Sequence, residues 1–262
     1  MDTPDTNRQQ PVFLTAWWRN LVMLNYEVDP DTVTPFLPRG IELDVWRGRT
    51  LVSIVAFEFA DVRVLNLPVP FHRHFEEINL RFYVRRRTAD GSRRGVVFIR
   101  ELVRQPIVSF LARLLYGEPY RTLPMERRFR HHPVPPAPPG GTPRERPATF
   151  RYSWRHDRKW HPVEATADTT LDPRQPEPGS EEEFITDHTY GYGTRHGRTI
   201  EYVVEHPPWR YWNPAKAGLD CDASTLRNLY GESFAPFLRA PRSAFLVEGS
   251  PVTVRRPRAI RA

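Results

Sequence analysis

The chain has 262 residues, a net charge of +7 at neutral pH and one cysteine, Cys221. A single cysteine excludes an internal disulfide and any zinc site built from several cysteines, and the acids beside it, Asp220 and Asp222, oppose a reactive thiolate. No apolar run reaches the ~18 residues of a membrane span, and the segment after Met1 is polar and acidic, unlike a signal peptide. We therefore expect a cytoplasmic protein with no membrane partner.

The excess of basic over acidic residues, with a pI near 9.8, raises the question of nucleic-acid binding. The arginines are spread along the chain, and acids are interleaved with them throughout. A phosphate-binding surface would instead concentrate basic charge on one face. We expect no nucleic-acid partner and rank this class below the others.

The length fits one domain over residues 1–262, because all-β domains commonly exceed ~200 residues. Residues 1–11 are expected to form a disordered tail. Two segments rich in proline, 131–147 and 173–183, cannot hold regular structure and are expected to form surface loops.

The first part of the chain, from Phe13 to about Val97, is predicted to be rich in β-strands. Residues 28–37 read as a short helix, with Asp29 as its N-cap and Pro30 at the first helical position. Two hairpins are predicted from turn residues flanked by apolar runs: strands 43–46 and 51–59 joined by residues 47–49, and a second hairpin with its tip at residues 85–92.

The second part adds one clear helix and two strand pairs. Residues 105–116 have apolar side chains at helical spacing, with Gly117 just after the end, and predict a helix that covers the core. Segments 149–154 and 160–169 are predicted to pair as a hairpin. Segments 184–193 and 199–206 are predicted to form another strand pair.

Residues 76–85 alternate strictly and carry the main functional signal. One face of this strand holds Glu77, Asn79, Arg81 and Tyr83. The other face is wholly apolar: Ile78, Leu80, Phe82 and Val84. An acid, an amide, an arginine and a phenol on one face are typical of a small-molecule pocket inside a β-barrel. The alternative is an ordinary antiparallel strand with its polar face in water.

Several motifs along the chain resemble one family. They are Thr15-Ala16-Trp17-Trp18-Arg19-Asn20-Leu21, the segments 26–30, 35–44 and 51–59, Arg93-Arg94-Gly95-Val96-Val97-Phe98, the block 112–120 and His206-Pro207-Pro208-Trp209. In this order they resemble the YqjF-like family, DUF2071, over roughly residues 12 to 258. That family resembles a branch of the acetoacetate decarboxylase-like superfamily. The resemblance implies a mainly β fold with a few helices, a cone-shaped and mostly antiparallel β-barrel with a buried cavity and a covering helix.

The decarboxylase reaction itself is not expected. In acetoacetate decarboxylase one lysine of a pair that follows a proline forms the Schiff base, and the lysine beside it lowers its pKa. The resemblance aligns this pair with Ile107 and Val108. The chain has only two lysines, Lys159 and Lys216, and neither has a lysine neighbour. Arginine stays protonated and cannot replace lysine as the nucleophile.

Glu77 is the candidate catalytic residue, because it stands where the resemblance places a pocket acid. Asn79, Arg81 and Tyr83 on the same face, and Arg19 from the first motif, are the candidate ligand-binding residues. Arg81 would keep Glu77 ionised if the two pair, whereas an unpaired, buried Glu77 would have a raised pKa. The alternative is a structural ion pair that fixes strand register.

Histidines offer a weaker route to chemistry. His72 and His74 share one face of an extended segment, with carboxylates close behind, which superficially resembles cupin-type metal ligation. Glu77 falls on the opposite face and the segment follows prolines, so a solvated loop is favoured. The His131-His132 pair in the proline-rich stretch is weaker still. We expect no metal and no cofactor.

These features predict a protein that binds a small carbonyl- or carboxylate-bearing organic molecule in a β-barrel cavity. Two classes of function stay open: a lysine-independent enzyme that uses acid/base chemistry, and a ligand-binding or accessory protein without turnover. The sequence leaves the ligand's identity, the physiological partners and the oligomeric state open, including a homo-oligomer.

Overall fold

The computed structural model describes residues 10–69, 73–106, 109, 117, 119–132, 146–169 and 171–260. Most of these residues lie in strands, which are β1 (Val12–Val28), β2 (Glu42–Leu43), β3 (Thr50–Val64), β4 (Leu67–Pro68), β5 (Phe75–Thr88), β6 (Gly91–Val103), β7 (Tyr120–Thr122), β8 (Met125–His132), β9 (Arg146–His156), β10 (Lys159–Thr166), β11 (Tyr190–Arg195), β12 (Arg198–Glu205), β13 (Tyr211–Trp212), β14 (Lys216–Leu219), β15 (Ser243–Arg255) and β16 (Arg258–Ala259). The described helices are short: α1 (Pro30–Val33), the 3-10 helix η1 (Thr34–Phe36), α3 (Glu181–Thr186) and α4 (Ala223–Tyr230). None of these helices has the length and apolar character needed to cross a membrane.

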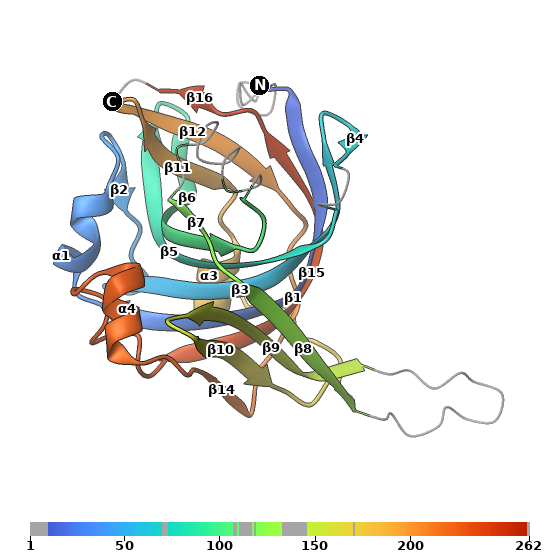
Figure 1. The fold of residues 1–262 in the computed structure, drawn as a ribbon. Coiled ribbons are helices and arrows are strands. Elements are labelled where there is room, and N and C mark those ends of the chain that lie inside the picture. Colours follow the sequence, from blue (N-terminus) through green and yellow to red (C-terminus); the bar gives the residue numbers. More distant parts are fainter. Residues whose placement is uncertain are drawn as a thin grey trace.

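The larger sheet curls into a barrel whose strands follow the order β13-β15-β1-β3-β5-β6-β11-β12-β16 (Figure 1). Its long neighbours are antiparallel, whereas β6 runs parallel to β7 and to β11. β12 also meets β15, but only through Val204↔Val254 and Glu205↔Thr253. The contact of β6 with β11 is equally short. The wall therefore curls back on itself without being fully closed, and the fold is mainly β, as the resemblance implied.

The barrel wall is buried on both faces. Outward-facing residues such as Leu24, Ile54 and Leu80 share one apolar core with Trp154 and Val163 of the smaller sheet. That sheet has the order β14-β10-β9-β8 and lies beside the barrel (Figure 1). Helix α4 adds Leu226, Leu229 and Tyr230 to the same core. Residues one step along each strand, such as Met23 and Val55, belong to a second core inside the barrel.

Helix α3 belongs to the interior core through Phe184 and Ile185. Its start is fixed by Ser180, whose hydroxyl accepts a hydrogen bond from the backbone N–H of Glu183 at 3.1 Å. Three acidic residues in the first turn favour the positive end of the helix dipole. A short helix thus fills part of the barrel interior and positions the residues that follow it.

Several predicted elements are confirmed. Asp29 caps α1, its side chain accepting a hydrogen bond from the N–H of Asp31 at 2.9 Å. The hairpin of β5 and β6 turns between Thr88 and Gly91, at the predicted tip. Strands β9 and β10 form the predicted hairpin.

Two predicted elements are wrong. The segment 43–46 does not form a hairpin with β3: Trp46 bridges only to Arg49, and β2 pairs with β5 instead. The N–H of Asp44 bonds to the carbonyl of Tyr83, which ties this segment to β5. The first residues of the predicted strand 184–193 are helical, because α3 occupies Glu181–Thr186 and strand β11 starts at Tyr190. The predicted loop 173–183 therefore ends where α3 begins.

Other predictions lie partly or wholly outside the described residues. Of the predicted helix 105–116, residues 107–108 and 110–116 are outside, and so are residues 1–9 of the tail. In the predicted loop 131–147, the ends belong to β8 and β9 and residues 133–145 are outside the described ranges. The assignment of residues 1–262 to one domain stays a prediction.

Candidate functional site

Strand β5 carries the candidate site and has neighbours on both sides, β3 and β6. Every residue from Phe75 to Val84 is buried. The apolar face packs in the outer core, and Tyr83 of the polar face packs in the interior core. The alternation of the strand therefore directs Glu77, Asn79, Arg81 and Tyr83 into the barrel, and none of them lies in open water.

Glu77 is held by two hydrogen-bond donors. The Tyr120 hydroxyl of β7 donates to Oε2 at 2.9 Å, and the Asn79 amide donates to Oε1 at 3.0 Å. Burial raises the pKa of Glu77 to about 7, although both hydrogen bonds and the charge of Arg81 act to lower it. Burial and the charges of Glu101 and Glu77 keep the pKa of Tyr120 well above its ordinary value. Near neutral pH Glu77 can therefore exist in either form, which suits proton transfer.

Arg81 is a buried cation without a carboxylate partner among the described residues. The residue is only 8% exposed. Its one described hydrogen bond is long, with the guanidinium donating to the carbonyl of Ile185 at 3.5 Å. Its Nε is buried without a hydrogen-bond partner. The predicted Glu77–Arg81 ion pair does not form at contact distance, because Glu77 bonds to Tyr120 and Asn79 instead. Arg81 thus retains donors for a ligand.

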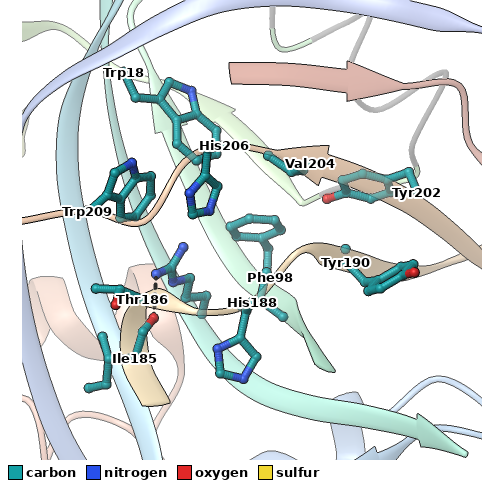
Figure 2. Close-up of a pocket in the computed structure, with 13 residues that line it drawn as sticks. Trp18, Phe98, Ile185, Thr186, His188, Tyr190, Tyr202, Val204, His206 and Trp209 are labelled. Carbon is teal, nitrogen blue, oxygen red and sulfur yellow. Dashed lines mark hydrogen bonds between the residues drawn. The ribbon is translucent and has the colours of Figure 1, made fainter. Parts of the chain in front are cut away.

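Arg81 lines a small cavity of about 30 Å³ inside the barrel. Figure 2 shows its aromatic surroundings, with His206 lying against Trp209 and Trp18 nearby. The full lining is Trp18, Arg81, Val96, Phe98, Ile185, Thr186, His188, Tyr190, Gly191, Tyr202, Val204, His206 and Trp209. Among the described residues of the wall, the ionisable groups are Arg81, the two histidines and the tyrosine phenols.

Both cavity histidines are shifted toward the neutral form. Burial lowers the pKa of His188 to about 4, which outweighs the opposing contact with Asp44. Burial also lowers the pKa of His206, whose Nδ1 lies 3.0 Å from the carbonyl oxygen of Pro207 and whose ring stacks on Trp209 at 4.1 Å between centroids. At neutral pH the positive charge on the described part of the wall is therefore that of Arg81.

Tyr83 and Asn79 lie on the predicted face but serve internal networks. The Tyr83 hydroxyl is 2.5 Å from the hydroxyl of Ser53, which donates to the Asn25 side chain at 2.6 Å. Neither Tyr83 nor Asn79 lines the described cavity. Of the four residues on the face, Arg81 is the one in the cavity wall.

Arg19 is placed away from this site. It is exposed, and its guanidinium lies 5.3 Å from the ring of Trp17, which is itself 43% exposed. A β-bulge near Arg19 and Asn20, where Asn20 has a φ of 55°, turns Trp18 inward instead. The sequence pattern does not reveal that bulge, and Arg19, a candidate ligand-binding residue, does not line the cavity that contains Arg81.

The remaining candidates do not gather around a metal. His72 lies outside the described residues, and the exposed His74 is 3.9 Å from Asp61. Within the described ranges no three His, Cys, Asp or Glu side chains form a group that could hold a metal ion. The absence of a metal stays a prediction. Ile107 and Val108 also lie outside the described residues.

The two lysines lie on the smaller sheet, away from the cavity. Lys159 starts β10 and Lys216 starts β14, and both are exposed. Neither lines the cavity that contains Arg81.

Tyr120, His188 and the cavity role of His206 were not predicted from the sequence. The motif His206-Pro207-Pro208-Trp209 and the Trp18 motif were noted as family features, and both line the cavity, so this signal could have identified them. Tyr120 and His188 come from other parts of the chain, and only the fold brings them to β5.

Comparison with known proteins agrees with this architecture. The model of the DUF2071 family, an uncharacterized conserved protein, matches residues 15–250. The uncharacterized protein YqjF of Bacillus subtilis is 34% identical over 68 residues, which span 26% of this chain and 28% of YqjF.

Two solved structures are similar in fold. The enduracididine biosynthesis enzyme MppR complexed with pyruvate has a TM-score of 0.61 at 16% identity, covering 95% of this chain and 90% of MppR. An acetoacetate decarboxylase-like enzyme from Sphingomonas wittichii has a TM-score of 0.62 at 13% identity, covering 96% and 94%. At these identities the likeness concerns the fold alone. The family match, which spans most of the chain, shows that this protein belongs to the DUF2071 family.

Proposed function

We propose that this protein binds a small organic carboxylate inside its barrel, with Arg81 as the counter-ion. The observation that carries the proposal is the buried Arg81, which lines the cavity and has no carboxylate partner among the described residues. An unpaired buried charge is costly, and a guanidinium is suited to hold a carboxylate through two hydrogen bonds. A bound anion would supply the missing partner.

The size and the walls of the cavity narrow the ligand class. A cavity of about 30 Å³ has room for one or two water molecules, so even a three-carbon acid requires the side chains of the wall to move outward. A drug-sized ligand is far too large for it. The aromatic walls and the neutral histidines would contact an apolar or carbonyl-bearing remainder. MppR, which has a similar fold, has been solved with pyruvate, a three-carbon 2-oxo acid. That complex supports a small oxo acid as the first ligand to try.

A second candidate function is lysine-independent acid/base catalysis with Glu77 as the proton-transfer residue. It is favoured by the buried position of Glu77 on the strand face of Arg81 and by its pKa of about 7. Asn79 and Tyr120 would hold the carboxyl group in place. The alternative is a binding or accessory protein in which Glu77 has only a structural role.

Calorimetric titration with pyruvate tests the binding proposal. Acetone, which lacks the carboxylate, serves as the matched control ligand, and Arg198→Met, a change at an exposed arginine, serves as the matched control variant. We expect Arg81→Met to lose a charge-assisted contact of ~1.5 to 3 kcal/mol, or roughly 10- to 150-fold in affinity, with Arg198→Met unchanged. Equal affinity of Arg81→Met and the parent, or equal binding of acetone and pyruvate, would contradict the proposal.

The same titrations separate the two functions. Glu77→Gln is nearly isosteric and is expected to leave pyruvate affinity within a few fold. If Glu77 transfers protons, this variant abolishes whatever turnover the parent shows. A parent that binds pyruvate but converts none of a panel of small oxo acids favours the accessory protein.

A further inference from the structure

A second polar group lines the same cavity, next to the strand that carries Arg81. His188 follows helix α3, is 7% exposed and lines the cavity. Its ring centroid lies 4.8 Å from that of Tyr83, and the Arg81 guanidinium lies 5.8 Å from the centroid of the same ring. Figure 2 shows the His188 ring below Phe98 in the cavity wall. His188 and Arg81 therefore contact one aromatic ring from two elements of the fold.

Asp44 gives His188 a defined orientation. Its Oδ2 lies 3.5 Å from His188 Nε2 and accepts a hydrogen bond from Arg94 Nε at 2.7 Å. The backbone N–H of Asp44 bonds to the carbonyl of Tyr83 at 3.0 Å, so the carboxylate is fixed to β5. Burial raises the pKa of Asp44, but its contacts with His188 and Arg94 outweigh this effect and keep the pKa below its ordinary value.

This arrangement distinguishes the two ring nitrogens, although both are buried without a hydrogen-bond partner among the described residues. Asp44 approaches Nε2 at 3.5 Å, an ion-pair distance, and a carboxylate on that side favours the tautomer with the proton on Nε2. That tautomer leaves a lone pair on Nδ1. A buried acceptor without a partner is costly, and such groups occur where a ligand or a reaction uses them. The alternative is a purely structural role, in which His188 only packs against Tyr83 and Phe184.

We propose that His188, oriented by Asp44, accepts a proton from the carbon next to the carbonyl group of a 2-oxo acid whose carboxylate is bound by Arg81. In this step the C–H bond breaks and its proton forms an N–H bond at Nδ1. The electron pair of the C–H bond forms a carbon–carbon double bond, and the carbonyl π electrons move to oxygen, giving an enolate.

The charges around His188 support this step. The imidazolium that forms faces the carboxylate of Asp44, and the positive charge of Arg81 favours the negative charge of the enolate. Return of a proton from Nδ1 to carbon restores the 2-oxo acid, so the exchange needs no lysine, cofactor or oxidant. This inference rests on the proposed function, because it uses Arg81 to place the substrate.

Hydrogen–deuterium exchange of pyruvate in D₂O tests the inference directly. The methyl protons of pyruvate are those that an enolate exchanges, and proton NMR follows their loss. We expect the parent protein to accelerate exchange over the same buffer, and His188→Gln to lose roughly 100-fold or more of this rate, a typical contribution of a general base. His188→Gln should keep its pyruvate affinity within a few fold. His196→Gln, at the exposed tip of the β11–β12 hairpin, is the matched control and should exchange like the parent.

Asp44 is expected to act as a positioning residue. Asp44→Asn should slow exchange at saturating pyruvate while changing the affinity little, and Asp44→Glu should recover part of the rate. Thermal melts verify that each variant is folded, and His188→Asn provides a second substitution if His188→Gln is not.

The outcomes separate this inference from the proposed function. Pyruvate binding that requires Arg81, without exchange above the buffer rate, overturns the role of His188 and leaves the binding proposal intact. Exchange by His188→Gln at the parental rate also overturns it, and then Glu77→Gln shows whether Glu77 is the base. A parent that neither binds pyruvate nor exchanges its protons overturns both.

Discussion

Tyr120 and Glu77 come from different strands and meet inside the barrel, where the phenol donates to the carboxylate at 2.9 Å. We expect Tyr120→Phe to destabilise the fold by about 1.5 to 3 kcal/mol at pH 8, where Glu77 is mainly ionised, because a buried carboxylate loses a donor. Urea unfolding measures the effect. In the Glu77→Gln background the same change should cost clearly less, and an equal cost in both backgrounds would show that the pair is not coupled.

The raised pKa of Glu77 predicts a pH dependence of stability. In the unfolded chain the carboxyl group ionises near its ordinary value of 4.5, whereas in the folded protein it stays protonated up to about pH 7. Between these values the folded state holds the extra proton, so this group's contribution to stability falls as the pH rises from about 4.5 to 7. The loss is on the order of 3 kcal/mol, at 1.36 kcal/mol for each pKa unit.

The measurement is the difference in unfolding free energy between the parent and Glu77→Gln across this pH range. Glutamine does not titrate, so the difference isolates the carboxyl group. It should move in favour of Glu77→Gln as the pH rises. A difference that stays constant from pH 5 to 8 would contradict the shifted pKa.

His188 predicts the opposite slope at lower pH. Burial lowers its pKa to about 4. Between pH 6.5 and 4, His188 is therefore protonated in the unfolded chain but stays neutral in the folded protein. This group's contribution to stability is therefore lost as the pH falls from 6.5 to 4. The charged groups that act on the ring are Asp44, which raises its pKa, and Arg94 and Arg81, which lower it.

NMR of histidine ring nitrogens checks this expectation. The His188 signals should stay those of a neutral ring at pH 5.5, with Nε2 protonated. Titration of His188 near its ordinary value of 6.5 would contradict the lowered pKa.

The alternation of residues 76–85 allowed the site strand to be predicted, because a period of two determines which side chains share a face. It does not determine which of them reaches a cavity. Arg81 does so because α3 ends beside it, and the residues of α3 were predicted as a loop up to 183 and as a strand from 184. Its helical start depends on the Ser180 cap and three adjacent acids, in a segment whose prolines and glycine favoured a loop. His188 was missed for the same reason.

Local sequence patterns also did not predict which strands pair when they are far apart in the chain. The turn at residues 47–49 has the composition of a hairpin, yet β2 pairs with β5, and this pairing brings Asp44 to His188. Trp18 and Arg19 are neighbours on β1, and Trp18 lines the cavity whereas Arg19 is exposed. Gly249, the partner of Arg19 on β15, has a φ of 85° and lies so close to the Trp18 carbonyl that a Cβ there would be 2.0 Å from its oxygen. A single residue of register thus decides which of the two side chains enters the barrel.

Replacement of Glu201 is expected to lower the free energy of unfolding more than replacement of an exposed acidic residue. Its side chain is fully buried and accepts from Arg93 and Arg258 at 3.0 Å each, from Arg86 at 3.3 Å and from Tyr192 at 3.0 Å. Glu201→Ala leaves three arginines around an empty space and should cost about 3 to 5 kcal/mol in unfolding free energy. Glu232, which is 83% exposed beside Arg227, is the control, and Glu232→Ala should change stability by about 0.5 kcal/mol or less. Similar losses in both variants would contradict the assignment of a buried charge network.

The position of the two lysines predicts that no imine forms with a 2-oxo acid in the barrel. A Schiff-base lysine needs a lowered pKa and contact with the bound carbonyl, and Lys159 and Lys216 are instead exposed on the smaller sheet. Incubation with pyruvate and borohydride, followed by mass spectrometry of the intact chain, should therefore give no adduct beyond that of a Lys159→Arg, Lys216→Arg double variant. The exchange of pyruvate protons should be unchanged in that double variant. A stoichiometric adduct on either lysine, or loss of exchange in the double variant, would return the chemistry of this fold to the imine route and leave His188 and Arg81 with a binding role only.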